Sequence, residues 1–74
     1  MDRTDALVRE IAGILTIDPA QLSPDTPLEG VGWDSVAVLS TIALIDEQYG
    51  ITVSGDALAR CGTVREIAEL VGKG

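Results

Sequence analysis

All three prolines of this 74-residue chain lie in one short stretch, at Pro19, Pro24 and Pro27. A proline has no backbone N–H for a helical hydrogen bond, and it forces the residue before it toward extended backbone. We therefore predict that residues 16–34 form a long loop, with one short helical turn capped by Asp18. A loop of this length in a small domain tends to be functional.

The segments on both sides of the loop have the apolar spacing of helices. The first predicted helix covers residues 2–15, and its apolar face is formed by Leu7, Val8, Ile11, Ile14 and Leu15. The second covers residues 35–49, with an apolar stripe at Val38, Leu39, Ile42, Ile45 and Tyr49. Because the second helix is apolar over more than the usual arc, we expect it to be either central or partly exposed for a partner.

The C-terminal part of the chain contains further helix signals. Gly50 is a natural C-terminal cap for the second helix, and Ser54 is placed to cap a short helix over residues 55–60. Thr63 and Glu66 have the spacing of a capping box, which predicts a last helix to about residue 71, ended by Gly72. The sequence thus predicts an all-α fold: a small four-helix bundle, with three main helices and one short helix, in a single domain of residues 1–74.

The composition excludes several classes of function. Twelve acidic and five basic residues give a net charge of −7, which repels nucleic acid. This charge either suits partners with basic patches or only keeps a small domain soluble. The chain has no histidine and one cysteine, Cys61, which excludes a histidine-based triad, a Cys/His zinc site and an internal disulfide. The N-terminus is not a signal peptide, and no apolar run approaches the roughly 18 residues of a membrane span. We expect a monomeric cytoplasmic protein without a metal site.

The residues that open the second helix are candidates for chemistry. The sequence Gly-Trp-Asp-Ser-Val occupies positions 32–36. Asp34 is placed to cap the helix and Ser35 to be its first residue. Free backbone amides and the helix dipole there favour an anion, such as a phosphate ester on the serine oxygen. Taken alone, an Asp–Ser pair before an apolar helix is most often only a cap.

The wider context of this motif resembles an acyl carrier protein, a member of the phosphopantetheine-binding carrier family. The resemblance covers the whole chain and rests on Gly32-x-Asp34-Ser35, on Leu-Glu-Gly at 28–30 and on Ile-Asp-Glu-Gln-Tyr-Gly-Ile at 45–51. It implies that Ser35 is the attachment point for 4′-phosphopantetheine, which a separate phosphopantetheinyl transferase takes from coenzyme A. The thiol of this arm would hold an acyl group as a thioester, and the aliphatic core could admit the acyl chain.

The resemblance also implies how the protein would work. It would shuttle acyl groups between enzymes of fatty acid, polyketide or specialised acyl-transfer pathways and would not be an enzyme itself, which agrees with the absence of histidine. Its partners would be acyl-activating, acyltransferase or synthase enzymes with basic or apolar docking patches. Since the chain starts at a methionine and ends soon after the last helix, we expect a free-standing carrier.

The sequence departs from the family pattern in two places. Val36 stands where the family usually has leucine, and we expect it to keep an apolar contact for the transferase. Many fatty-acid carriers have acids in the first turns of this helix, whereas this chain has Ala37, Ser40 and Thr41. We therefore expect partners to recognise this helix by apolar and hydroxyl contacts, in a dedicated pathway. A charge inserted at Ala37 or Ser40 should then weaken the binding of a cognate partner.

Other candidate residues have a structural interpretation beside the functional one. Trp33 is expected to contact the arm or a partner, or to pack on the core. Asp46, Glu47 and Asp56 form an acidic recognition patch, bind a cation weakly, or are only a solvated face, which is the more common case. Cys61 is more often a small buried hydrophobe than a reactive thiol in such a position.

Two alternatives to an acyl carrier remain at this point. One is a peptidyl or aminoacyl carrier, although those often have Gly-Gly-His-Ser where this chain has Gly-Trp-Asp-Ser. The other is an unmodified helical adaptor that binds a basic partner through the second helix. Ser35→Ala distinguishes a carrier of either kind from an adaptor, because a carrier loses its function with this substitution and an adaptor does not.

Overall fold

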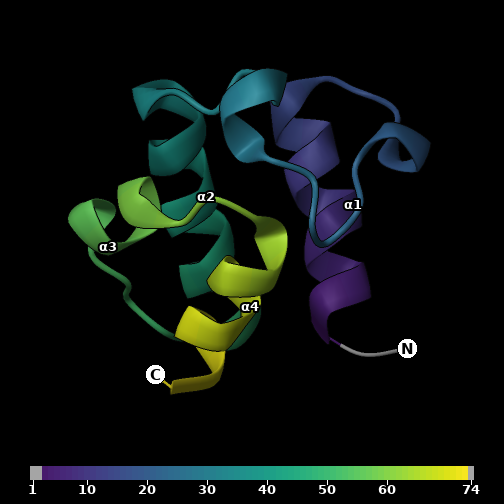
Figure 1. The fold of residues 1–74 in the computed structure, drawn as a ribbon. Helices are drawn as coiled ribbons and strands as arrows, with labels where there is room; N and C mark the ends of the chain where they lie inside the picture. Colours follow the sequence, from purple (N-terminus) through teal and green to yellow (C-terminus); the bar gives the residue numbers. More distant parts are fainter. Residues whose placement is uncertain (1–2, 74) are drawn as a thin grey trace.

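The computed structural model describes residues 3–73, which contain four α-helices and, within that range, no strand (Figure 1). The helices are α1 (Arg3–Leu15), α2 (Ser35–Tyr49), α3 (Gly55–Arg60) and α4 (Val64–Lys73). Two 3-10 helices, η1 (Pro19–Gln21) and η2 (Leu28–Val31), lie in the connection between α1 and α2. The predicted all-α fold of three main helices and one short helix, with a long connection after the first, is confirmed.

The core is aliphatic and draws side chains from every α-helix and from the long connection. Its fully buried large members are Leu7, Ile11, Leu28, Ile45, Leu58, Ile67, Val64 and Val71. In the bundle, α1 packs against α4 and α2, and α2 packs against α3. The helix α2 thus contacts both α1 and α3 but leaves Val36 and Leu39 exposed, so of the two interpretations of its apolar sequence the partly exposed one is confirmed.

The inward face of α2 differs from the predicted stripe. Ala37, Val38, Thr41 and Ile45 are buried, whereas Leu39, placed in the stripe from its sequence spacing, is 66% exposed. Thr41 can be fully buried because its hydroxyl donates a hydrogen bond to the carbonyl oxygen of Ala37 at 2.8 Å, so no polar group is left unpaired. The prediction failed because α2 is apolar on several sides and its sequence does not distinguish them.

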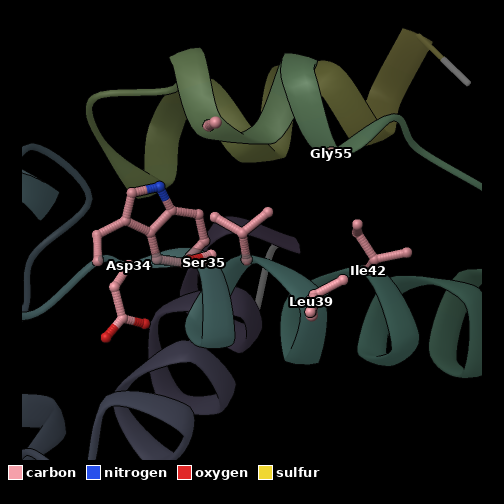
Figure 2. Close-up of a pocket in the computed structure, with 8 residues that line it drawn as sticks. Asp34, Ser35, Leu39, Ile42 and Gly55 are labelled. Carbon is pink, nitrogen blue, oxygen red and sulfur yellow. The ribbon is translucent and has the colours of Figure 1, made fainter.

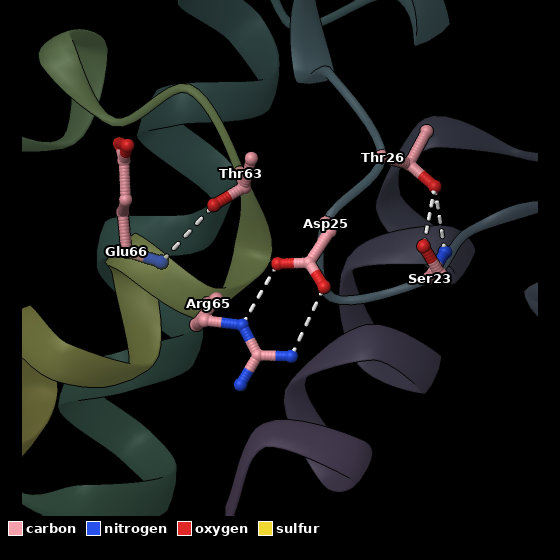
Figure 3. Close-up of polar contacts among 6 residues, drawn as sticks. All are labelled: Ser23, Asp25, Thr26, Thr63, Arg65 and Glu66. Atoms are coloured by element: carbon pink, nitrogen blue, oxygen red, sulfur yellow. Dashed lines mark hydrogen bonds and ion pairs between the residues drawn. The ribbon is translucent and has the colours of Figure 1, made fainter.

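The long connection is attached to the start of α4. Leu22 and Leu28 insert into the core, and the backbone N–H of Leu28 donates to the carbonyl of Gly62 at 2.9 Å. The N–H of Arg65, near the start of α4, donates to the Pro24 carbonyl at 3.0 Å, and its guanidinium forms two hydrogen bonds with Asp25 (Figure 3). These contacts fix the path of the connection toward α2.

The ends of the helices follow local rules with two exceptions. Asp18, Ser54 and Gly50 are caps as predicted, with Gly50 in the left-handed conformation at φ 66°. The predicted end of α4 at Gly72 is wrong, because this glycine does not adopt a positive φ and the helix continues to Lys73. In the predicted capping box the amide of Glu66 donates to Thr63, but the Glu66 carboxylate accepts from Gly62 and not from Thr63.

Candidate functional site

Asp34 fixes the start of α2 and so the position of Ser35. Its backbone is extended, and its Oδ1 accepts a hydrogen bond from the amide of Ala37 at 2.9 Å. Its carbonyl oxygen accepts the first helical hydrogen bond, from Val38, also at 2.9 Å. Asp34 is therefore the helix cap that the sequence predicted, and Ser35 is the first helical residue.

The approach to this cap requires a glycine. The 3-10 helix η2 ends at Gly32, whose φ of 90° and ψ of 26° are left-handed. An L-residue would be strained in this conformation. Gly32 turns the chain from η2 toward Trp33 and the extended Asp34, so that Ser35 begins α2 at the surface.

The Ser35 hydroxyl is exposed and lies where a phosphate ester is favoured. The amides of Ser35 and Val36 belong to the first turn, so they have no acceptor within the helix. The positive end of the helix dipole lies at these amides and favours a negative group there. A chain without histidine offers no imidazole base to activate the serine oxygen. A phosphate group on this oxygen, such as that of phosphopantetheine, fits the residues present.

An apolar groove of about 420 Å³ starts at Ser35 and lies between α2 and α3 (Figure 2). One side is formed by Val38, Leu39 and Ile42 of α2, and the other by α3, where small residues leave space. The groove is lined by Trp33, Asp34, Ser35, Val38, Leu39, Ile42, Gly55 and Ala59. A chain attached to Ser35 would thus have an apolar surface beside its attachment point.

Comparison with known proteins decides the family. Residues 5–71 match the family described as "Phosphopantetheine attachment site". The chain belongs to this family of acyl carrier proteins. It is 34% identical over 65 residues to the oxytetracycline polyketide synthase acyl carrier protein of Streptomyces rimosus, covering 86% of this chain and 68% of that one.

Two further relatives are carriers as well. The actinorhodin polyketide synthase acyl carrier protein of Streptomyces coelicolor is 34% identical over 47 residues, 64% of this chain and 55% of that protein. The acyl carrier protein MbtL of Mycobacterium tuberculosis is 39% identical over 54 residues, 72% of this chain and 64% of that protein. The match thus spans little more than half of the actinorhodin carrier. Members of the family carry 4′-phosphopantetheine covalently and are not themselves catalysts.

The outward face of α2 in this carrier is apolar and uncharged. Val36 is 71% exposed and Leu39 66%, and Ser40 and Ala43 are exposed beside them. No charged residue occurs from position 35 to position 45. Val36 and Leu39 are three residues apart, so their side chains are neighbours on the surface of the helix.

Two residues expected on this docking face are not on it. Ala37 is 5% exposed and Thr41 is fully buried, because both lie one helical turn apart on the face that contacts the core. The expectation that a partner contacts Ala37, or the hydroxyl of Thr41, is therefore wrong. Val36 and Ser40 are exposed, as docking requires.

Two of the three acidic candidates, Asp46 and Glu47, lie far along α2 from Ser35. Asp46 and Glu47 are exposed in the last turns of α2, and Asp46 is eleven residues from Ser35, roughly 16 Å along the helix axis. Asp56 is exposed in the first turn of α3. The structure thus separates Asp46 and Glu47 from the serine, whereas Asp56 directly follows Gly55, which lines the same groove as Ser35.

Cys61 is half-buried just after α3, and its thiol donates a hydrogen bond to the Ala57 carbonyl at 3.3 Å. Burial, and secondarily the negative charge of Glu66, raise the pKa of Cys61 above its usual value.

Over residues 3–73, no group of three or more metal-binding side chains lies together, and no helix is long and apolar enough to cross a bilayer.

The residues that sequence reasoning missed are those of the groove. The sequence places Leu39 and Ile42 only in the apolar stripe of the second predicted helix, and it gives Gly55 and Ala59 no role. Their only sequence signal is that α2 is apolar on several sides and that α3 has small residues at both positions.

Proposed function

We propose that Ser35 is the attachment point of 4′-phosphopantetheine and that residues 1–74 form one carrier domain, which shuttles acyl groups as thioesters between biosynthetic enzymes. The observation that carries this proposal is the exposed Ser35 hydroxyl at the start of α2, next to the apolar groove. It is supported by membership of a family named for such a site. A cytoplasmic location, where coenzyme A is available, is part of the proposal.

The attachment step needs little from the carrier itself. The Ser35 oxygen attacks the phosphorus of coenzyme A that bears pantetheine, a phosphoester bond forms, and adenosine 3′,5′-bisphosphate leaves. The serine proton passes to a base of the transferase. The carrier holds Ser35 exposed through the Asp34 cap, and its first-turn amides stabilise the phosphate charge. In this proposal the carrier has no catalytic residue.

We further propose that the transferase and the later synthase or acyltransferase enzymes dock on Val36, Leu39 and Ser40. This face offers no charge to a basic patch, so its affinity comes from apolar contact and depends little on salt. Ser40→Glu is expected to raise the KM of the transferase for the apo-protein several-fold, whereas Asp46→Asn at the far end of α2 leaves it nearly unchanged. A KM that rises steeply with salt, or that responds to Asp46→Asn and not to Ser40→Glu, contradicts this docking mode.

The cargo class is proposed to be an uncharged acyl group of a polyketide-type or other specialised pathway. Two of the relatives above are named as polyketide synthase carriers. An aminoacyl cargo would bring an ammonium group, which needs a negative partner in the groove. Asp34 is the one ionisable residue that lines the groove. In Figure 2 its carboxylate points away from α3, so it does not face a cargo in the groove. Its Oδ1 is also engaged by the Ala37 amide.

The test of the proposed function is the mass of the intact protein. The purified chain is incubated with coenzyme A, magnesium and a broad-specificity phosphopantetheinyl transferase, beside Ser35→Ala and Ser23→Ala, which changes an exposed serine of the long connection outside the docking face. We expect one phosphopantetheinyl group on the wild type and on Ser23→Ala, and none on Ser35→Ala. No addition with several transferases, or addition to Ser35→Ala, contradicts the proposal and favours an unmodified adaptor that uses the same α2 face.

A further inference from the structure

The side chain of Trp33 carries a buried polar atom without a partner. Its Nε1–H has no hydrogen-bond acceptor in the part of the chain that the structure describes. The indole as a whole is half-buried and packs against the edge of the core. A buried donor that lacks an acceptor carries a desolvation cost that no interaction offsets. The indole N–H therefore gains from any acceptor that a group outside the chain supplies.

Trp33 also provides the one side-chain donor that remains beside Ser35 once the serine is modified. Both residues line the apolar groove. The carboxylate of Asp34, which lines it as well, accepts hydrogen bonds, and a phosphoester consumes the hydroxyl proton of Ser35. The other residues that line the groove have apolar side chains or, at Gly55, none. A polar group attached to Ser35 thus finds a side-chain donor among the lining residues only at Trp33.

The indole lies within reach of an arm on Ser35. The two residues are separated by one residue, so their Cα atoms are at most about 7.6 Å apart. The 4′-phosphopantetheine arm has its first amide carbonyl a few bonds beyond the phosphate. Since no hydrogen bond holds the N–H of the half-buried indole in its present direction, a rotation about the side-chain torsions turns it toward this carbonyl.

We propose that the indole N–H of Trp33 donates a hydrogen bond to the first amide carbonyl of the arm on Ser35, and so sets the direction in which the arm leaves the serine. This inference rests on the proposed function. Trp33 is then a positioning residue, which acts on the part of the arm nearest the protein and not on the acyl group at its far end. One contact pairs two groups that otherwise lack a partner, the buried donor and a carbonyl beside an apolar surface.

The chain provides its own reporter, because Trp33 is its only tryptophan and gives a single indole N–H signal in NMR spectra. The isotope-labelled apo-protein is compared with the form loaded from coenzyme A without an acyl group, and loading is confirmed by intact mass. We expect the indole proton to move downfield on loading and to show a nuclear Overhauser effect to the pantoyl protons of the arm. An unchanged indole signal, or a shifted one without that effect, overturns the proposal.

Two matched variants separate the hydrogen bond from a packing role. Trp33→Phe keeps an aromatic ring and removes the donor. Tyr49→Phe removes the polar atom from another half-buried aromatic residue, at the opposite end of α2 from Ser35. The thermal midpoint is measured for the apo and loaded forms, with the mobility of the pantoyl methyl groups from NMR relaxation. We expect loading to raise the midpoint and restrain the methyl groups in the wild type and in Tyr49→Phe, and both effects to be lost in Trp33→Phe. A purely structural role lowers both midpoints of Trp33→Phe equally and refutes the proposal.

The outcomes distinguish this inference from the proposed function. If intact mass shows no loading of Ser35, the proposed function fails. If loading succeeds but the indole signal does not respond, the role of Trp33 alone is refuted. Should Trp33→Phe not fold, the indole signal of the wild type still decides the question.

Discussion

Replacement of Asp34 by alanine tests whether the cap of α2 holds the site in place. The substitution removes the 2.9 Å hydrogen bond from the Ala37 amide to Oδ1, at a cost of about 1 kcal/mol, within a range of roughly 0.5–2. It also removes a negative charge from the positive end of the helix, which adds about 0.3–1 kcal/mol. Domains of this length are stable by about 4–11 kcal/mol, so the expected loss is a substantial fraction of the total.

The assay is urea unfolding of the apo-protein, followed by circular dichroism and by Trp33 emission. Asp34→Asn keeps an acceptor oxygen and loses only the charge, so it should lie between the wild type and Asp34→Ala. Asp18→Ala removes an equivalent cap from the three-residue helix η1 and should cost less, because few residues depend on it. The reasoning is refuted if Asp34→Ala unfolds at the same urea concentration as the wild type, or if Asp34→Asn costs as much as Asp34→Ala.

Three further predictions concern the supports of the site. Leu28 is a fully buried anchor of the long connection, so Leu28→Ala should destabilise the fold by about 2–5 kcal/mol. Leu39→Ala, at an exposed position, should destabilise it far less. Equal urea midpoints for the two variants would contradict this. The hydrogen bond from Arg65 lowers the pKa of Asp25 below its ordinary 3.8. The pair therefore stabilises the fold above pH 3.8, and this stabilisation is lost as the pH falls through the lowered pKa. In an NMR titration of the carboxyl groups, the lowered pKa of Asp25 should return to its ordinary value in Arg65→Gln. Because burial raises the pKa of Cys61, iodoacetamide should alkylate it more slowly than free cysteine at neutral pH, and equal rates by mass spectrometry would refute this.

The bounds of α2 and α3 could be predicted because local residues set them. Asp34 and Ser54 each accept a hydrogen bond from the amide three residues later, and Gly50 adopts a left-handed cap. These interactions need no knowledge of the tertiary structure. For the same reason the sequence located Ser35 at the first position of α2 before its environment was known.

The environment of Ser35 could not be predicted because it depends on packing between helices. The groove exists since α3 presents Gly55 and Ala59 to Leu39 and Ile42, and nothing in either segment alone indicates this register. The inward face of α2 was missed for a related reason. Thr41 is polar and was expected at the surface, but its hydroxyl is satisfied within the helix and the residue is buried.

The distribution of charge explains how α2 can remain apolar on three sides. One side packs on the core, one lines the groove, and one exposes Val36 and Leu39. An exposed apolar face promotes self-association, but the net charge of −7 makes copies of the chain repel one another at distances of about a Debye length, close to 10 Å. All acids lie outside positions 35–45. The charges that cause this repulsion are therefore not on the face that would meet a partner. The acidity of the chain and the neutrality of α2 are thus two parts of one arrangement.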